Sequence, residues 1–374
     1  MSGFGSVKQA ANGTWFYVVD VPSATGERKQ VRKRGFETKK AANAALKALH
    51  NAVASGVRVD PTRITVGEYL CDVWLPQIEG QVRPSTIATY KLLVETHIKP
   101  KVGAVRLQQL DRATVAAWVA GLSKAGAAGK TVRNIFGVLN KALTDAVELE
   151  LIGRNVAAGL KALPPRSQPT PRAWDVEQLG VFLAGMAGDR LAAMWRFLAM
   201  TGCRRGEVMG LRWRDVDLKA STATITSQRT LAGNVVVEGA PKTAAGARTI
   251  TLDEGTLAVL KSWKKSQTEE RLMMGSGWQG GDDFVFTNED GSPIYPPIVT
   301  RRFHDACERL TLPQIGVHGL RHTAATYLIG AGVNPRVVQQ RLGHAHVAIT
   351  LGLYTHVLPG HDREAVEALS RALG

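Results

Sequence analysis

Histidine and arginine side chains gather near the end of this 374-residue chain. In the run His318-Gly-Leu-Arg321, the histidine and the arginine are three residues apart and therefore share one face of a predicted helix. An imidazole that gains or loses a proton then lies beside a permanently charged guanidinium, a pair suited to phosphate chemistry without a metal. Five of the nine histidines lie in this part of the chain: His318, His322, His344, His346 and His356.

A zinc site is the alternative interpretation of this cluster. His318 and His322 are four residues apart, as two zinc ligands on one helix would be. No glutamate lies between them, and no cysteine or acidic residue nearby completes a set of ligands. We therefore predict no metal site, and we predict no disulfide framework because no C-x-x-C pair occurs among the three cysteines, Cys71, Cys203 and Cys307.

Nucleotide-cofactor motifs are absent or lack their context. No Walker-type phosphate loop occurs in the sequence. Gly275-Ser-Gly-Trp-Gln-Gly280 matches G-x-G-x-x-G, but a polar, helix-like stretch precedes it and no helix begins after it. The pattern indicates a loop, and we predict no cofactor.

Four further motifs lie on either side of the His318–Arg321 pair. A phosphodiester under attack gains charge on its non-bridging oxygens, which two arginines can neutralise as a metal pair would. A tyrosine, whose pKa is ordinarily about 10, needs nearby cations and a base to become a nucleophile. A lysine can give the leaving oxygen its proton. The motifs supply these groups in order: Thr201-Gly202-Cys203-Arg204-Arg205-Gly206-Glu207, Pro241-Lys242-Thr243, Leu342-Gly343-His344 and Tyr354-Thr355-His356.

In this order, the motifs resemble those of the tyrosine recombinase (phage integrase) family over most of residues 173–374. The resemblance implies cleavage of DNA through a 3′-phosphotyrosyl bond, without ATP or metal. Glu207 would support the site by orienting a catalytic group. The catalytic residues implied by the resemblance are Arg204, Lys242, His318, Arg321, His344 and the nucleophile Tyr354.

Several of these assignments have rivals in the sequence. Arg205 adjoins Arg204, which we prefer because the family pattern has its arginine directly after T-G-x. We expect His318 to act as the base and His344 to donate a hydrogen bond to the phosphate. The rival phenols are Tyr295, in a proline-rich turn, and Tyr327, on the helix that continues from Arg321, where core packing is the better explanation.

The charge of the chain favours a polyanionic partner. Lysine and arginine exceed aspartate and glutamate by 47 to 32, a net charge of +15. The first sixty residues are the most basic, and a strand, a turn and a second strand are predicted there before a helix. A solvated basic surface is the alternative, but clustering on a two-stranded ribbon favours DNA contacts by Arg28, Lys29, Arg32, Lys33, Arg34, Lys39 and Lys40.

Residues 61–163 have helical spacing throughout and predict a bundle of about four short helices. Thr65 and Glu68 form a predicted capping box, and Ser85 is a second candidate cap. Basic residues near the expected helix ends suit phosphate contacts, although a scattered solvated face explains them almost as well. The candidates are Arg83, Lys91, Lys130 and Arg133.

These patterns predict a multidomain, mainly α protein with small β elements. By their resemblance to domains of the family, residues 1–60 would form an arm-type DNA-binding domain of a small sheet and a helix, and residues 61–163 a helical, SAM-like core-binding domain. Four prolines near residues 164–172 predict a linker. Residues 173–374 would form a mixed α+β catalytic domain, with strands expected at 223–227, 234–237, 248–252 and 284–286.

The resemblance implies a site-specific recombinase, the integrase of a phage or mobile element. It would act on double-stranded DNA at core and arm sites as a homotetramer, through a Holliday junction. A host DNA-bending factor and an excisionase would assist, and the C-terminal segment, with its apolar stripe, would dock on a neighbouring protomer or on its own domain. The sequence has no membrane segment, so we expect a cytoplasmic protein.

A chromosome-dimer resolvase, a type IB topoisomerase and a catalytically inactive DNA-binding regulator are the alternative functions. The basic N-terminal block favours an integrase, since a resolvase that recognises one short site needs no second DNA reader. The full set of six catalytic residue types argues against an inactive regulator.

Overall fold

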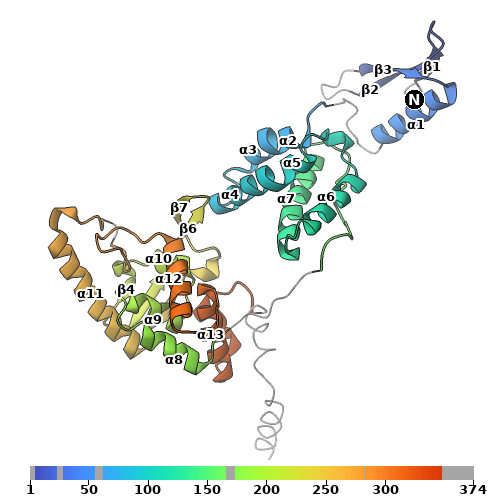
Figure 1. The fold of residues 1–374 in the computed structure, drawn as a ribbon. Coiled ribbons are helices and arrows are strands. Elements are labelled where there is room, and N and C mark those ends of the chain that lie inside the picture. Colours follow the sequence, from blue (N-terminus) through green and yellow to red (C-terminus); the bar gives the residue numbers. More distant parts are fainter. Residues whose placement is uncertain (1–4, 23–27, 55–61, 166–172, 282, 348–374) are drawn as a thin grey trace, which may run out of the picture. The chain divides into compact units, whose positions relative to one another are not determined.

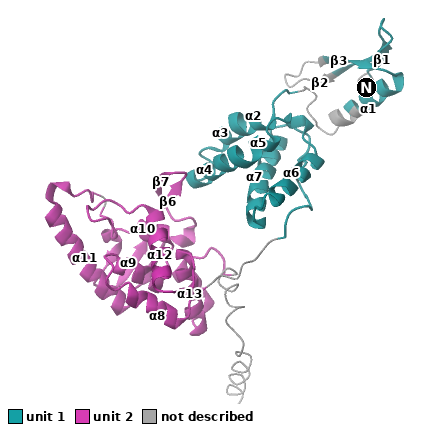
Figure 2. Ribbon diagram, in the orientation of Figure 1, with its two compact units in different colours: residues 1–168 teal, residues 169–374 magenta. Residues whose placement is uncertain are grey.

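The computed structural model describes residues 5–22, 28–54, 62–165, 173–281 and 283–347. The chain divides into two compact units, residues 1–168 and 169–374 (Figure 2). Helices predominate and the sheets are small, so the predicted fold class is confirmed. No helix in the described part of the chain is both long enough and apolar enough to cross a membrane.

The first unit begins with an antiparallel sheet and one helix (Figure 1). Strands β1 (Ser6–Gln9), β2 (Trp15–Pro22) and β3 (Arg28–Phe36) pair in that order, and α1 (Lys39–Ala54) follows them. Tyr17, Val19 and Leu46 form the buried core between sheet and helix. The sequence analysis missed β1, because its four residues, Ser-Val-Lys-Gln, carry a single apolar side chain.

The helical part of the first unit contains two helices that each include a π-helical stretch. The first runs through α2 (Val66–Glu68), Tyr69–Trp74 and α3 (Leu75–Ile78), and the second through α4 (Pro84–Leu93), Val94–Ile98 and α5 (Lys99–Val102). A short turn at Leu107–Gln109, α6 (Arg112–Lys124) and α7 (Gly129–Glu148) complete this part. The apolar faces of these helices bury one continuous core.

Helix starts in this bundle follow local side-chain chemistry. The Thr65 hydroxyl accepts from the Glu68 main-chain nitrogen at 3.2 Å, and Glu68 Oε2 accepts from the Thr65 nitrogen at 2.8 Å, so the predicted capping box is confirmed. The prediction for Ser85 was wrong. Helix α4 begins at Pro84, after Arg83, because a proline loses nothing at a first helical position, where its missing N–H would have no partner.

The second unit is built from helices around two small antiparallel sheets. Its helices are α8 (Val176–Gly185), α9 (Ala192–Thr201), α10 (Arg205–Met209), α11 (Glu254–Met274), α12 (Pro296–Arg309), α13 (Val317–Gly330) and α14 (Pro335–Leu342). Strands β4 (Val216–Asp217), β5 (Thr222–Ile225) and β8 (Arg248–Thr251) form one sheet; β6 (Gln228–Ala232) and β7 (Val235–Gly239) form a hairpin.

The strand predictions need correction. Strands β4 and β6 were not predicted. Residues 284–286 form no strand; Phe284 makes an isolated bridge with Arg212, and Thr287 makes another with Pro293. The apolar side chains of this segment pack in the core of the second unit, but its main chain forms no continuous ladder with a neighbouring strand.

An aromatic core supports the second unit. The rings of Trp174, Phe182, Trp195 and Phe303 pack together, with Trp174 and Phe182 centroids 5.2 Å apart. The Trp174 main-chain nitrogen also donates to the Thr323 hydroxyl at 3.0 Å, which ties the start of the unit to α13. This core contacts α9 through Trp195 and α13 through Thr323, the two helices nearest to the candidate catalytic arginines Arg204 and Arg321.

Candidate active site

Arg204 lies in the short connection between α9 and α10. Its Nη1 donates to Glu207 Oε1 at 2.6 Å, and its Nη2 donates to the Gly343 carbonyl at 3.1 Å. Glu207 is buried; burial alone would raise the pKa of its carboxyl, but Arg248 and then Arg204 outweigh that effect and lower it. Glu207 is thus an ionised, buried carboxylate that fixes the orientation of Arg204.

Arg321 lies in the first turns of α13 and is only 2% exposed. Its Nη1 donates to the Gly202 carbonyl at 2.9 Å, whereas its Nη2 is buried and has no hydrogen-bond partner among the residues that the structure describes. Burial, and then the charge of Arg204, lower the pKa of Arg321 to about 9, so it remains a cation at neutral pH. A buried cationic nitrogen without an acceptor is suited to an anionic oxygen of a ligand.

Two histidines border these arginines. His344 is buried, and burial together with Arg321 and Arg204 lowers its pKa to about 3. His318 is exposed at one edge of its ring. Burial of the rest of the ring, and then His322 and the charge of Arg321, lower its pKa to about 4. The His318 and His322 rings meet edge to face, with centroids 4.8 Å apart. Both His318 and His344 are therefore neutral at pH 7, and each ring keeps one nitrogen with a free electron pair and one N–H.

Two glycines allow the segments of the site to approach each other. Gly202 ends α9 with a φ of +64°, and a Cβ there would lie 2.5 Å from Leu342 Cδ2. Gly343 ends α14 with a φ of +69°, and a Cβ there would lie 2.7 Å from the Ala245 carbonyl oxygen. Both turns need the left-handed backbone that glycine adopts without strain. They bring the ends of α9 and α14 and the Lys242 turn close together.

The last two predicted catalytic residues have different positions. Lys242 is exposed in the turn between β7 and β8, three residues after β7 ends. Tyr354 lies outside the described residues. The structure thus brings Arg204, His318, Arg321 and His344 into one electrostatic cluster, in which each arginine influences the pKa of the histidines.

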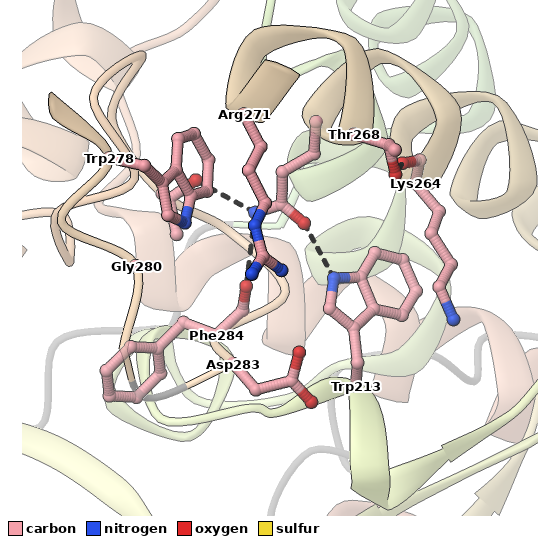
Figure 3. A pocket seen from close by; sticks show the side chains of 10 residues that line it. Trp213, Lys264, Thr268, Arg271, Trp278, Gly280, Asp283 and Phe284 are labelled. Atoms are coloured by element: carbon pink, nitrogen blue, oxygen red, sulfur yellow. Dashed lines mark hydrogen bonds between the residues drawn. The ribbon is translucent and has the colours of Figure 1, made fainter. Parts of the chain in front are cut away.

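A separate shallow cleft contains the glycine pattern that the sequence analysis assigned to a loop. Gly275–Gly277 follows α11 and no strand precedes it. Figure 3 shows Trp278 and Gly280 lining the cleft with Trp213, Lys264 and other side chains. Its volume of about 140 Å³ is smaller than the roughly 300 Å³ at which ligand pockets begin. Within the described residues, no three His, Cys, Asp or Glu side chains are grouped as metal ligands.

Three parts of the chain match known domain families. Residues 6–53 match an arm DNA-binding domain, and residues 67–123 match the N-terminal SAM-like domain of phage integrases. Residues 174–361, half of the chain, match the phage integrase family and include all of the predicted catalytic residues. The chain belongs to the phage integrase family. It is a tyrosine recombinase, as the resemblance implied.

Curated relatives resemble this member of the family along most of their length. The chain is 28% identical to a XerC-like tyrosine recombinase of Caldanaerobacter subterraneus subsp. tengcongensis, over 96% of the chain and 97% of the relative. It is 26% identical to the ICEBs1 integrase of Bacillus subtilis, over 98% of the chain and the whole relative. Both matches therefore extend over nearly the whole of this chain.

Solved structures of similar fold were determined with DNA. The Tn1549 transposon integrase in complex with transposon right end DNA has a TM-score of 0.70 at 22% identity, over 82% of this chain and all of that chain. A lambda integrase tetramer bound to a Holliday junction has a TM-score of 0.57 at 16% identity, over 93% of this chain and 94% of the lambda chain. At these identities the likeness establishes the fold.

The basic residues predicted in the N-terminal sheet lie on or just after β3. The Arg32 guanidinium covers the Phe16 ring, 4.2 Å from its centroid, and the ammonium groups of Lys33 and Lys39 lie near other rings. Arg34 and Lys40 are exposed. The side chains of Arg28 and Lys29 lie outside the described part of the structure.

The predicted DNA contacts in the helical part differ in how firmly they are held. Lys130 is exposed, and so is Arg83, before α4. Lys91 forms an exposed ion pair with Glu79 at 2.9 Å, which DNA phosphates could replace at small cost. Arg133 Nε donates to the Pro164 carbonyl at 2.7 Å, so this arginine also holds the end of the first unit.

The sequence analysis assigned no role to Arg248, which the structure joins to the site. Arg248 Nη2 contacts Glu207 Oε2 at 2.9 Å, on the side opposite to Arg204. The available signal was its position, at the first residue of the strand that follows the Lys242 turn. A single arginine at the start of a strand is common, so that signal alone predicts nothing specific.

Replacing Gly202 with alanine is expected to destabilise the second unit. A left-handed backbone costs a non-glycine residue about 1–2 kcal/mol, and the added Cβ would collide with Leu342. A loss of about 2 kcal/mol would lower the unfolding midpoint by roughly 4–8 °C in calorimetry of the full chain. Gly180→Ala, within α8 and with no neighbour near the added Cβ, is the control and should not lower the midpoint. Equal midpoints for both variants would contradict the prediction.

Stability should fall on acidification because of His344. Its pKa is 6.5 when unfolded and about 3 when folded, so the unfolded state binds more protons between these values. The free energy of unfolding therefore decreases as pH falls below 6.5. Thermal unfolding midpoints at pH 7 and pH 5 should differ less in His344→Gln than in the unchanged protein. The exposed His346 provides the matched control, His346→Gln, and an equal flattening of the pH dependence in both variants would refute the assignment.

Proposed function

We propose that this recombinase is a metal-independent integrase whose Tyr354 attacks one DNA strand. The tyrosine oxygen bonds to phosphorus, the P–O5′ bond breaks, and a 3′-phosphotyrosyl linkage forms. His318 accepts the tyrosine proton, and Lys242 gives a proton to the departing 5′-oxygen. Reversal with a second strand's 5′-hydroxyl then rejoins the DNA through a Holliday junction, without an external energy source.

The observation that carries this proposal is the Arg321 guanidinium. It is buried, its Nη2 has no partner within the described residues, and burial, together with its charge and that of Arg204, lowers the pKa of both His318 and His344. Such a group supplies charge where a phosphorane-like transition state develops it, and the neutral His318 is already able to accept a proton. His344 would donate the remaining hydrogen bond to the phosphate.

The proposed assembly follows from the three-part organisation. Residues 1–60 would bind arm sites. Residues 61–163 and 173–374, joined by a linker at 164–172, would bind the core site. Four protomers would act together on two DNA sites. The match of residues 6–53 to an arm DNA-binding domain favours an integrase over a resolvase that reads one site. A C-terminal segment that docks on a neighbour, a host DNA-bending factor and an excisionase complete the proposal.

Adduct formation on a nicked half-site tests this function. The purified protein is mixed in EDTA with a labelled half-site from the flanks of its own element, and denaturing gels are scored for a slower band. We expect a covalent adduct without metal, because the two arginines replace the metal charges. Binding without any adduct on this substrate would instead support the inactive regulator.

A further inference from the structure

Arg248 uses every nitrogen of its guanidinium inside the protein. The side chain is only 7% exposed. Nε donates to the Arg341 carbonyl at 2.6 Å, Nη1 to the Gly246 carbonyl at 2.8 Å, and Nη2 to Glu207 at 2.9 Å. Nη2 also lies 3.6 Å from Cys203 Sγ. A side chain this buried, with an acceptor at every nitrogen, is placed to hold the protein together and not to contact DNA.

Each of these three acceptors belongs to a different segment of the proposed active site. Glu207 orients Arg204 through a 2.6 Å ion pair. Gly246 closes the turn that carries Lys242, where the Gly246 nitrogen donates to the Thr243 carbonyl at 2.8 Å. Arg341 lies at the end of α14, just before the Gly343 turn and His344. One side chain thus joins segments that lie 41 and 93 residues away along the chain.

The packing around Arg248 is as close as its hydrogen bonding. A Cβ at Gly343 would lie 2.9 Å from Arg248 Nη1 and 3.2 Å from its Cδ, so the glycine turn lies directly against the arginine. A Cβ at Gly246 would lie 2.5 Å from Pro241 Cβ, so Gly246, whose carbonyl accepts from Arg248, packs directly against the residue before Lys242. Displacement of the guanidinium would therefore move both turns.

The charge of Arg248 is as important as its shape. Glu207 is a buried carboxylate held between two guanidiniums, with Arg204 on Oε1 and Arg248 on Oε2. Without Arg248, the Arg204 guanidinium would be drawn further onto the carboxylate and away from the phosphate. A lysine at position 248 could neutralise Glu207, but it lacks the planar guanidinium fork with which Arg248 reaches its three acceptors.

We propose that Arg248 is a positioning residue of the recombination reaction, which holds Arg204, the Lys242 turn and the His344 turn in their reactive arrangement. The inference rests on the proposed function, because it concerns the same cleavage step. A misplacement of about 1 Å in an active site can cost on the order of 100-fold in rate, and three groups would shift together here.

The test measures single-turnover adduct formation on the nicked half-site at saturating protein. Arg248→Gln should slow it by about 100-fold without loss of DNA affinity. Arg190→Gln is the matched control, since Arg190 also joins a carboxylate, Glu270, at 2.6 Å and a carbonyl, that of Thr287, at 2.7 Å, yet contacts none of the proposed catalytic segments. Its rate should be unchanged, although its unfolding midpoint should fall similarly.

Two further variants separate positioning from a loss of folding. Arg248→Lys retains the charge beside Glu207 and should fall between the unchanged protein and Arg248→Gln in rate. Glu207→Gln added to Arg248→Gln should cause little further loss, because both changes disturb the orientation of the same Arg204 guanidinium. Multiplicative losses in the double variant, or equal slowing by Arg190→Gln, would overturn the inference. An unchanged protein that forms no adduct would refute the proposed function itself, so the two failures are distinguishable.

Discussion

Tyr354→Phe is expected to reduce covalent adduct formation by at least about 10⁴-fold, because the phenylalanine ring has no oxygen to bond to phosphorus. DNA binding should persist, since the arginines proposed to bind phosphate are unchanged. The measurement pairs denaturing-gel quantification of the adduct with a gel-shift assay on the same half-site. An adduct that persists in Tyr354→Phe would transfer the nucleophile to another residue.

The rival phenols provide the controls for this experiment. Burial, followed by the charges of Asp175 and Glu177, raises the pKa of Tyr327, which is the wrong direction for a nucleophile. Tyr295 is 38% exposed and lies directly before α12. Tyr327→Phe and Tyr295→Phe should therefore form adduct at the normal rate.

Arg321→Met is expected to slow cleavage by about 10³-fold while leaving the protein at least as stable. The loss arises because a preorganised charge at the transition-state phosphate disappears, and one such donor is worth about 10²–10³ in rate. The stability is retained because the buried Nη2 has no partner in the described part of the chain, and removing a poorly compensated buried charge is often neutral or favourable. Single-turnover cleavage and thermal unfolding of the same preparation measure both quantities.

Arg321→Lys sharpens this prediction. Lysine retains a charge but lacks the planar fork whose separate nitrogens can hold the Gly202 carbonyl and a phosphate oxygen at the same time. It should therefore remain well below the unchanged protein in rate. A large fall in the unfolding midpoint of Arg321→Met would instead mean that Arg321 is mainly structural, and the assignment of the phosphate site would then fail.

Local sequence determined several parts of this structure. Thr65 and Glu68 form their capping box because a hydroxyl and a carboxylate three residues apart can reach each other's main-chain nitrogens whatever surrounds them. Asp111 likewise caps α6 by accepting from the Thr114 nitrogen at 2.7 Å. Arg204 and Glu207 pair across one helical turn for the same reason. The ordered motifs also sufficed to identify the family.

Local preference failed where tertiary packing had the larger effect. The strand β1 exists because it pairs with β2, since its own residues show little apolar alternation. The segment 284–286 is apolar enough for a strand but is buried by its surroundings and bridges at one residue. These outcomes depend on partners that lie elsewhere in the chain.

The sequence by itself determined which residue types this recombinase has for cleaving DNA, and in which order they occur. Only the tertiary structure decided that Arg321 is buried with an open nitrogen, that both neighbouring histidines are neutral, and that Arg248 connects three segments. The physical reason is distance along the chain. A contact across one helical turn depends on adjacent residues, whereas the contact from Arg321 to Gly202 spans 119 residues and depends on how the whole unit packs.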